Sequence, residues 1–370
     1  MKVVVTHPGR QHSHQAALAL ERAGMLAGYW SGVPAAGFGR YAPVPLDRSR
    51  TRWFPWTPAL RRTGPWPDFA ACRLFDQWAA RRLRGLETNA VIACEISALA
   101  TFREARRRGI ATLLDAPSIH HAAQDRLHGT TDSPSLHRRI VAVKDEEIRL
   151  ADHILTVSEL ARRTYLEAGV PPEQVHAVPL GADLELFSPD GAAPRETFTF
   201  FFSGATIHRK GFDLLLAAFD RVRTEAPVRL RIAGSRGDAA HLLDARGTDG
   251  SDVLGAVSQP DLAAELRRAD VLVLPSRNDS YGMVVAEALA SGTPVLVSEM
   301  VGSKDLVTEG KTGWIVPVED VNALAERMLW CVRRRDEVRG LRPDCRKAAE
   351  AATWAAYHGR FAELIRSLAG

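Results

Sequence analysis

Two series of alternating strand and helix patterns constrain the fold of this chain most strongly. In the first half, short apolar runs have the length of buried strands, and helical patterns such as FREARRRG and ELARRTYLEAG lie between them. These runs lie at residues 2–6, 90–95, 111–116, 153–158 and 175–180. Strands that alternate with helices predict a parallel sheet with helices on both faces.

A stretch rich in Pro, Gly and small residues, FSPDGAAPRET at 187–197, separates the first series from the second. The second series has apolar runs at 197–204, 228–234, 252–258, 269–276, 293–299 and 312–317. We therefore predict an α/β protein of two Rossmann-like, doubly wound domains, at 1–188 and 189–345, that face a central cleft. Residues 346–370 have a helical pattern, and we expect them to pack back on the first domain.

The composition is that of a globular protein. Hydrophobic residues make up 46% of the chain and charged residues 25%, and no apolar run approaches the roughly 18 to 20 residues that cross a bilayer. The apolar run at the N-terminus is too short for a signal peptide. The four cysteines form no CxxC pair, which disfavours a disulfide framework or a zinc site. We expect a cytoplasmic protein with reduced thiols.

Residues 40–84 carry a local excess of positive charge, with ten Arg against three Asp. The segment also contains Trp53, Phe54, Trp56, Trp66, Phe69, Phe75 and Trp78. Aromatic rings interleaved with cations are typical of a membrane interface, so peripheral contact with a membrane surface is one interpretation. The other is a solvated, Arg-rich helical face over an ordinary aromatic core. Because no nucleic-acid-binding motif accompanies the charge, we expect no nucleic-acid partner.

The most informative motif is LPSRNDSYGMVVAEALASGTPVLVS at 274–298, which predicts a strand, an acidic loop, a helix and another strand. Gly282 lies where the loop turns into the helix, so the first helical amides are free to bind an anion such as a diphosphate. Asp279 precedes the helix and Glu287 lies eight residues later, inside it. Such a pair suits two ends of one elongated ligand. For either acid alone, a cap or a polar contact within the protein is the alternative.

A second motif, SGATIHRKGFDLLLAAF at 203–219, follows directly on a predicted strand. Gly204 allows a tight exit from that strand, and Arg209, Lys210 and Gly211 precede an amphipathic helix. Two adjacent cations in such a loop can neutralise a diphosphate leaving group as its negative charge grows. Ordinary surface charge at a helix start is the alternative.

Together these motifs resemble the nucleotide-sugar signature of the retaining glycosyltransferases of family 4, the group 1 enzymes with GT-B architecture. The family pattern comprises PS-x-x-E-x-F-G, E-A-x-A-x-G-x-P-V and G-R-x-x-x-x-K-G. Here Asp279 stands in place of the first Glu, Tyr281 in place of Phe, and Ala205 in place of the Arg after Gly. Glu287 matches the residue that holds the ribose in the family, and Arg209 can supply the missing guanidinium. Residues 151–189 and 302–328 are also similar to the family.

The first predicted domain opens with the loop HPGRQHSH, in which Gly9 stands where many relatives have paired glycines. His7, His12 and His14 lie around it. Because no acid or thiol is near the His-x-His pair in sequence, we expect no metal there, and metal-free transfer is also what the resemblance implies. We interpret the loop as a polar element on the acceptor or donor side, with structural histidines as the alternative.

The resemblance also assigns residues to roles. A family His that meets the donor sugar falls in PSIHH, so His120 or His121 is a candidate. The catalytic candidates are Arg209, Lys210, Asp279, Glu287, His120 and His121. The candidates for donor binding are Gly204, Gly211, Ser280, Tyr281, Gly282, Met283, Val284 and Gly9.

We therefore expect a metal-independent hexosyltransferase without a cofactor. Its donor would be a nucleotide sugar, UDP- or GDP-linked, and its acceptor a hydroxyl of a glycan, a lipid-linked molecule or a small molecule. Retention of the anomeric configuration is implied by the resemblance alone. The alternatives are a catalytically inactive GT-B protein that binds a nucleotide sugar or a glycan, and a nucleotide-sugar epimerase, for which the sequence shows no pattern of acids and base.

Overall fold

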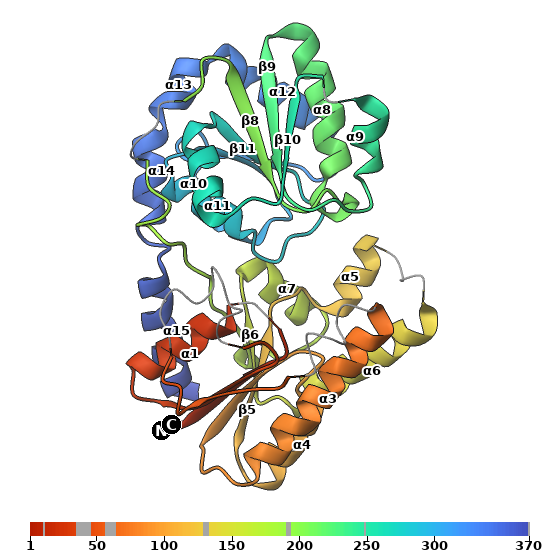
Figure 1. The fold of residues 1–370 in the computed structure, drawn as a ribbon, viewed down its shortest axis with the longest axis vertical. Helices are drawn as coiled ribbons and strands as arrows, with labels where there is room; N and C mark the ends of the chain where they lie inside the picture. The colour runs from red at the N-terminus through yellow and green to blue at the C-terminus, as the bar shows by residue number, and fades with distance from the viewer. Residues whose placement is uncertain are drawn as a thin grey trace. The chain divides into compact units, whose positions relative to one another are not determined.

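The computed structural model describes residues 1–9, 12–34, 46–55, 64–128, 133–189, 194–247 and 249–368. The chain divides into two compact units. The first unit is Met1–Val178 together with Ala355–Gly370, and the second is Pro179–Trp354. Each unit is built on one parallel sheet with helices on both faces (Figure 1), as the alternating patterns predict.

The sheet of the first unit has seven strands in the order β3-β2-β1-β4-β5-β6-β7. The strands are β1 (Val3–His7), β2 (Leu26–Ser31), β3 (Thr51–Trp53), β4 (Ala90–Cys94), β5 (Ala111–Ala116), β6 (His153–Thr156) and β7 (Val175–Ala177). The helices are α1 (Ser13–Arg22), α3 (Pro65–Leu83), α4 (Leu99–Arg107), α5 (His121–His128), α6 (Pro134–Leu150), α7 (Glu159–Glu167) and α15 (Trp354–Leu368). The strand order reverses between β1 and β4, and ligands of such sheets bind beyond the strand ends at this switch point.

The sheet of the second unit has six strands in the order β10-β9-β8-β11-β12-β13. The strands are β8 (Phe198–Ser203), β9 (Val228–Ala233), β10 (Ser251–Gly255), β11 (Val271–Leu274), β12 (Val295–Ser298) and β13 (Gly313–Val316). The helices are α8 (Phe212–Glu225), α9 (His241–Arg246), α10 (Gln259–Arg268), α11 (Met283–Ala290), α12 (Val321–Arg333), α13 (Arg335–Gly340) and α14 (Arg342–Ala349). The central strand β11 is wholly apolar, and β8 is apolar apart from Thr199 and Ser203; the ends of these strands flank the second switch point.

The division between the units falls before Pro179, earlier than the Pro- and Gly-rich stretch at 187–197 indicates. Residues after Pro179 already pack on the second unit. The Tyr281 hydroxyl donates a hydrogen bond to the Leu180 carbonyl, and Phe187 joins the apolar core of that unit. The boundary therefore follows side-chain contacts rather than local composition.

The C-terminal segment is shared between the two units. Cys345 of α14 is fully buried in the core of the second unit, whereas α15, apart from its first residue, belongs to the first unit. There His358 bonds through Nε2 to Gln15 at 2.8 Å and through Nδ1 to Arg22 at 2.9 Å, both on α1. The predicted segment 346–370 is thus divided after Trp354: the end of α14 completes the second unit, and α15 packs on the first.

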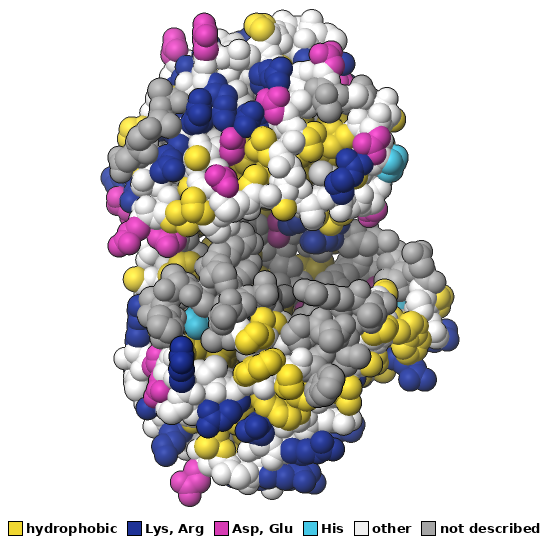
Figure 2. Space-filling view, viewed as in Figure 1, with side chains coloured by type: hydrophobic (Ala, Val, Ile, Leu, Met, Phe, Trp, Pro, Cys, Tyr) yellow, Lys and Arg dark blue, Asp and Glu magenta, His cyan; other side chains and the backbone are white. Residues whose placement is uncertain are grey.

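The basic and aromatic segment at 40–84 contains both core and surface residues. Phe75 is fully buried, and its ring lies 5.6 Å from that of Trp78 on the same helix, so these two belong to an aromatic core. Trp53 and Trp66 are 49% and 42% exposed. Figure 2 shows Lys and Arg side chains beside hydrophobic ones on the visible face of the first unit. Residues 40–45 and 56–63, with Trp56, Arg61 and Arg62, lie outside the described residues.

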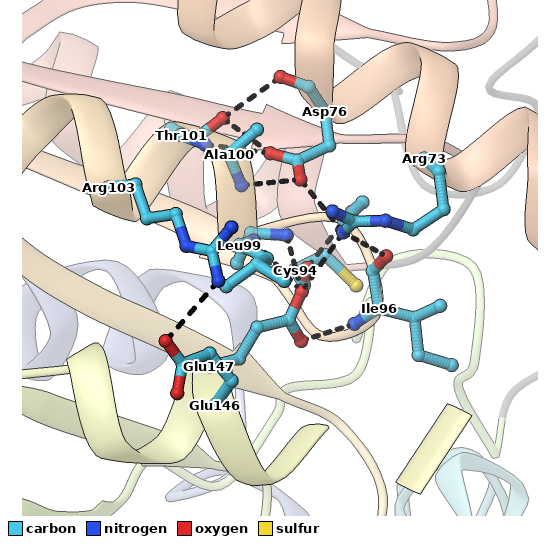
Figure 3. A network of polar contacts seen from close by, with 12 residues as sticks. Arg73, Asp76, Cys94, Ile96, Leu99, Ala100, Thr101, Arg103, Glu146 and Glu147 are labelled. Atoms are coloured by element: carbon cyan, nitrogen blue, oxygen red, sulfur yellow. Dashed lines mark hydrogen bonds and ion pairs between the residues drawn. The ribbon is translucent and has the colours of Figure 1, made fainter. Parts of the chain in front are cut away.

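The N-terminus of α4 is capped by a buried carboxylate from a neighbouring helix (Figure 3). Glu147 of α6 accepts hydrogen bonds from the amides of Ile96, Ala98 and Leu99 at 2.7, 2.8 and 3.0 Å. Burial raises the pKa of Glu147 to about 8, against the lowering effect of the amides. Ile96 has a φ of 69°, a region that β-branched residues rarely adopt, so its bond to Glu147 holds a strained turn.

A second carboxylate completes this cap. Asp76 of α3, fully buried, accepts from the amides of Ala100 and Thr101 at 2.7 and 2.9 Å. Arg73 on the same helix donates to Asp76 at 2.9 Å and lies 3.8 Å from Glu147. The network joins α3, α4 and α6. The first amides of α4 have no acceptor within their own helix, and the two buried carboxylates accept their hydrogen bonds.

Among the described helices, none combines the length and the hydropathy that a membrane crossing needs. The four cysteines, Cys72, Cys94, Cys331 and Cys345, are free and buried.

Candidate functional site

The loops that follow β8 and β11 pack backbone against backbone in the second unit. The Arg277 amide donates to the Arg209 carbonyl at 2.9 Å. Gly211 has a φ of 66°, and a Cβ on it would lie 1.9 Å from the Pro275 carbonyl oxygen. Only glycine fits both the conformation and the space. The RKG segment is therefore fixed against the loop that leads into α11.

Lys210 lies against that loop through its side chain. Its Nζ forms an ion pair with Oδ2 of Asp279, and the two side chains are 17% and 12% exposed. The same Oδ2 atom lies 3.3 Å from the position that a Cβ on Gly282 would take. Lys210, Asp279 and the first residue of the α11 turn thus converge at one place, as the two motifs predict.

The start of α11 offers backbone donors at this place. Gly282 is the N-cap with a φ of 81°, and no side chain caps the helix. In the part of the chain that the structure describes, the amides of Gly282, Met283 and Val284 donate no hydrogen bond. Uncapped amides at the positive end of a helix dipole, beside a lysine, form an arrangement that can bind a diphosphate.

Arg209 is exposed and its guanidinium donates to the Asn278 carbonyl at 3.2 Å, so it lies along the same loop. Two further polar atoms of the loop, Oγ of Ser276 and Oδ1 of Asn278, are buried and have no hydrogen-bond partner within the described ranges. Buried polar atoms are nearly always paired in native proteins. The loop therefore contains two buried polar atoms that no described residue of the protein pairs with.

Arg277 organises the site and was not identified from the sequence. It binds Asp213 at 2.7 and 2.8 Å and donates to the His208 carbonyl at 2.6 Å, which ties α8 and η4 (His208–Lys210) to the loop after β11. Burial acts to raise the pKa of Asp213, but the Arg277 guanidinium outweighs it and the pKa is lowered. The sequence indicates this role only through the position of Arg277 between Ser276 and Asp279. A charged residue in a loop is usually solvated, so that position alone did not identify it.

The other residues predicted in this motif have different surroundings. Glu287 is 3% exposed on α11, and Ser280 is partly buried. The Tyr281 hydroxyl donates to the Leu180 carbonyl, so that side chain anchors the chain entering the unit. Gly204 lies at the end of β8, and a Cβ on Gly234 would be 1.8 Å from its carbonyl oxygen, so the backbones of two strand ends touch there.

The first unit has its own polar cluster at the ends of β1, β4 and β5. Nε2 of His12 lies 3.0 Å from Oδ1 of Asp115, and both residues are buried. The ligand atoms of His7, Cys94 and Asp115 lie within 4.8 Å of one another. The expectation that no acid or thiol is near these histidines is wrong, because β4 and β5 bring them from about 90 and 100 residues away.

This cluster has the residue types of a metal site, but its groups also pair with one another. Asp115 accepts from His12, and Nδ1 of His7 accepts the Gly9 amide at 2.9 Å. Gly9 thus bends back on β1. His14 is buried and packs edge-on against Tyr29 at 5.9 Å.

His120 and His121 lie together after β5, with ring centroids 4.0 Å apart. His120 also packs edge-on against Tyr165, and burial together with His121 lowers its pKa to about 4. Nε2 of His121 lies 2.9 Å from Asp145 on α6. Both belong to the first unit, whereas the two cations and the acids Asp279 and Glu287 belong to the second.

Comparison with protein families and curated proteins finds a family match within the second unit. Residues 197–334 match the family model described as "Glycosyl transferases group 1". A D-inositol 3-phosphate glycosyltransferase of Jonesia denitrificans is 28% identical over 248 residues, which is 60% of this chain and 58% of that protein. A phosphatidyl-myo-inositol mannosyltransferase of Mycolicibacterium smegmatis is 34% identical over 184 residues, 47% of each chain. The chain thus spans about half of the length of the curated relatives it matches.

Solved structures extend the similarity of the fold to both units. Sucrose-phosphate synthase from Thermosynechococcus elongatus has a TM-score of 0.79 at 20% identity, covering 100% of this chain and 99% of its own. Anabaena HepE in complex with UDP has a TM-score of 0.71 at 14% identity, covering 99% and 100%. The second unit thus matches the group 1 glycosyl transferases, and the chain has the fold of GT-B glycosyltransferases.

Proposed function

We propose that this protein transfers a hexosyl residue from a nucleoside diphosphate sugar to a hydroxyl group of an acceptor. The observation that carries the proposal is the convergence of Lys210, Asp279 and the uncapped start of α11. Relatives named for glycosyl and mannosyl transfer support it, as does a structural neighbour solved with UDP-glucose.

In this proposal the diphosphate lies against the amides of α11, with Lys210 and Arg209 beside it. The bond between the sugar C1 and the diphosphate oxygen breaks, and a bond between C1 and the acceptor oxygen forms. The acceptor proton passes to the departing phosphate, and attack occurs on the same face, so the configuration is retained. Positive charge and helix amides stabilise the leaving group, and no metal is needed for that step.

Other residues hold the donor in this proposal. Asp279 binds hydroxyls of the sugar, Glu287 binds the ribose, and His120 or His121 contacts the sugar. Asp279 is one methylene shorter than Glu, and its ion pair with Lys210 supports a position close to the proposed diphosphate. The pair thus holds the lysine in place before the donor binds.

The experiment is incubation of the protein with UDP- and GDP-sugars, with and without EDTA, and measurement of nucleoside diphosphate release. We expect one donor to be consumed, at rates that EDTA leaves unchanged because the cations are protein side chains. Binding of a nucleotide sugar without any release, with or without an acceptor mixture, would instead indicate a catalytically inactive binding protein. Activity that EDTA abolishes would contradict metal independence.

We also propose that the first unit contacts anionic membrane surfaces. A groove of about 350 Å³ between α3 and α4 is lined by Arg73, Arg81, Arg84, Arg103 and Arg107. Glu104 pairs with Arg84 and Arg107. Asp76 and Glu147 lie against Arg73, and Glu146 pairs with Arg103, so the five arginines face four carboxylates. Exposed Trp66 and Leu74 lie on the same helix α3. Charge beside exposed aromatic and aliphatic side chains suits a lipid headgroup region.

Sedimentation with phosphatidylglycerol vesicles tests this contact. The triple variant Arg81→Gln, Arg84→Gln, Arg107→Gln is expected to lose about 1 kcal/mol of binding per charge at low salt. Arg236→Gln, on the second unit and 61% exposed at its side chain, is the matched control and should sediment like the wild type. Equal binding of the triple variant and the wild type would rule out this groove as the contact.

A further inference from the structure

The side chain of Arg277 uses its whole hydrogen-bonding capacity within the protein. Its guanidinium donates to both carboxylate oxygens of Asp213, to both of Glu319 and to the His208 carbonyl oxygen. A guanidinium has five N–H groups, and these five hydrogen bonds account for all of them. Arg277 therefore has no donor left for a ligand, and its role is to hold other parts of the chain.

The partners of Arg277 join three segments of the second unit. His208 lies in η4 after β8 and Asp213 in the first turn of α8, whereas Glu319 lies in the loop between β13 and α12. The Arg277 side chain is 18% exposed, so these hydrogen bonds are partly shielded from solvent. Two parallel hydrogen bonds to one carboxylate fix the geometry of an arginine. We refer to Arg277 with Asp213, Glu319 and the His208 carbonyl as the Arg277 clamp.

The Arg277 clamp holds the turn that carries Lys210. Arg277 donates to two successive carbonyls of η4, from its side chain to His208 at 2.6 Å and from its main-chain amide to Arg209 at 2.9 Å. Lys210 is the next residue, and its Nζ pairs with Asp279, two residues after Arg277. The place of the Lys210 side chain therefore depends on where Arg277 holds the backbone before it.

Glu319 is the strained member of the Arg277 clamp. Its φ of 66° lies in the left-handed region that favours glycine. Such conformations persist where the surrounding structure determines them, and they cluster at functional sites. The side chain of Glu319 is 56% exposed, so packing alone does not hold it, and its carboxylate reaches back to Arg277. The strained backbone is thus coupled to the clamp.

The charges of the Arg277 clamp are balanced within it. Two carboxylates, Asp213 and Glu319, face the single guanidinium of Arg277, so the clamp carries no net positive charge. An unpaired guanidinium beside η4 would repel the cations of that turn, Arg209 and Lys210. The clamp therefore positions these cations without opposing them.

We propose that Arg277 is the positioning residue of the cation that meets the leaving group: through the backbone of η4 it keeps Lys210 in place for a nucleoside diphosphate before the donor binds. The inference rests on the proposed transferase function and adds to it the residue that preorganises its cation. A cation that is held in place beforehand needs no reorganisation when charge develops on the leaving group. Loss of the clamp then reduces turnover through Lys210, although Arg277 itself touches no substrate.

The test compares Arg277→Gln with the matched control Arg231→Gln. Arg231, on β9 of the same unit, also pairs with two carboxylates, Asp252 at 2.9 Å and Glu265 at 2.7 Å, and its side chain is likewise 18% exposed. Its hydrogen bonds go to residues of β10 and α10. The control therefore makes the same chemical change in an ion-pair cluster that does not hold η4.

Hydrogen exchange of the free protein measures the hold on η4 without any ligand. The amides of Lys210 and Gly211 donate within this turn. We expect them to exchange at least about tenfold faster in Arg277→Gln and at the wild-type rate in Arg231→Gln, because only the first variant loses the anchor of the turn. Unchanged exchange of residues 208–211 in folded Arg277→Gln would overturn the inference.

Turnover separates positioning from a general loss of stability. We expect Arg277→Gln to lower kcat for nucleoside diphosphate release about 10- to 100-fold, with Arg231→Gln within about twofold of wild type. In the Lys210→Met background, Arg277→Gln should lower the single-turnover rate by less than about threefold, since the cation that it positions is gone. The same loss in both backgrounds, or wild-type kcat in folded Arg277→Gln, would show that Arg277 does not act through Lys210.

A thermal melt identifies variants that have lost the fold. If Arg277→Gln does not fold, Arg277→Lys takes its place in both measurements. It keeps the charge, but a single ammonium lacks the planar fork that reaches Asp213, Glu319 and His208 together. Failure of the proposed function itself looks different, because the wild-type protein would then consume no nucleotide sugar, while the exchange of η4 would still test the clamp.

Discussion

Replacement of Lys210 by Met is expected to reduce sugar transfer about 100- to 1000-fold, because one preorganised cation is removed from the charge that develops on the leaving group. Met keeps most of the apolar stem, so packing around η4 is preserved. The assay is release of nucleoside diphosphate at saturating donor, which reports kcat. Lys311→Met, at an exposed lysine of the same unit, is the matched control and should keep wild-type turnover.

The ion pair of Lys210 with Asp279 requires a second variant. Removal of the lysine alone leaves Asp279, 9% exposed, without its cation, so part of any loss reflects an unpaired buried charge. The double variant Lys210→Met with Asp279→Asn removes that charge. A thermal melt separates the two effects: we expect the double variant to recover the melting temperature lost in Lys210→Met, while turnover stays low in both variants. Near-normal turnover of Lys210→Met would show that the lysine takes no part.

Replacement of Glu147 by Ala is expected to destabilise the first unit by about 3 to 5 kcal/mol, because three backbone donors at the start of α4 lose their acceptor and Arg73 loses a carboxylate nearby. The strained turn at Ile96 also loses the bond that holds it. Urea denaturation gives the change in stability. Hydrogen exchange of residues 96–101 shows whether the loss is local to this cap.

Glu146→Ala is the control, because Glu146 is adjacent on the same helix and its ion pairs within the described residues are with the surface arginines Arg103 and Arg149. We expect it to cost less than about 1 kcal/mol. Equal effects of the two substitutions would show that the buried cap contributes no more than a surface ion pair.

The local features of the second unit could be predicted from the sequence. Gly211 and Gly282 both have positive φ at the turns where their motifs place them, and all six predicted strands are present. The residues that contact one another in these motifs are close in sequence or follow adjacent central strands. The hydrophobic pattern and the residue spacing are therefore enough to predict these contacts.

The first unit was less predictable, and each difference has a physical reason. β3 is three residues long and β2 contains Gly28, so neither forms a clear apolar run. The contact of His12 with Asp115 joins residues 103 positions apart, which only the strand order brings together. The same holds for the cap of α4, whose acceptors come from two other helices.

The central claim is that Lys210 and the start of α11 bind one diphosphate. Hydrogen exchange of the wild-type protein with and without saturating UDP or GDP measures this directly, because a bound diphosphate protects the amides it accepts from. We predict simultaneous protection of residues 207–211 and 282–285 by one of the two nucleotides, with loss of that protection in Lys210→Met. A nucleotide that binds tightly and protects neither segment, or only segments of the first unit, would contradict the account.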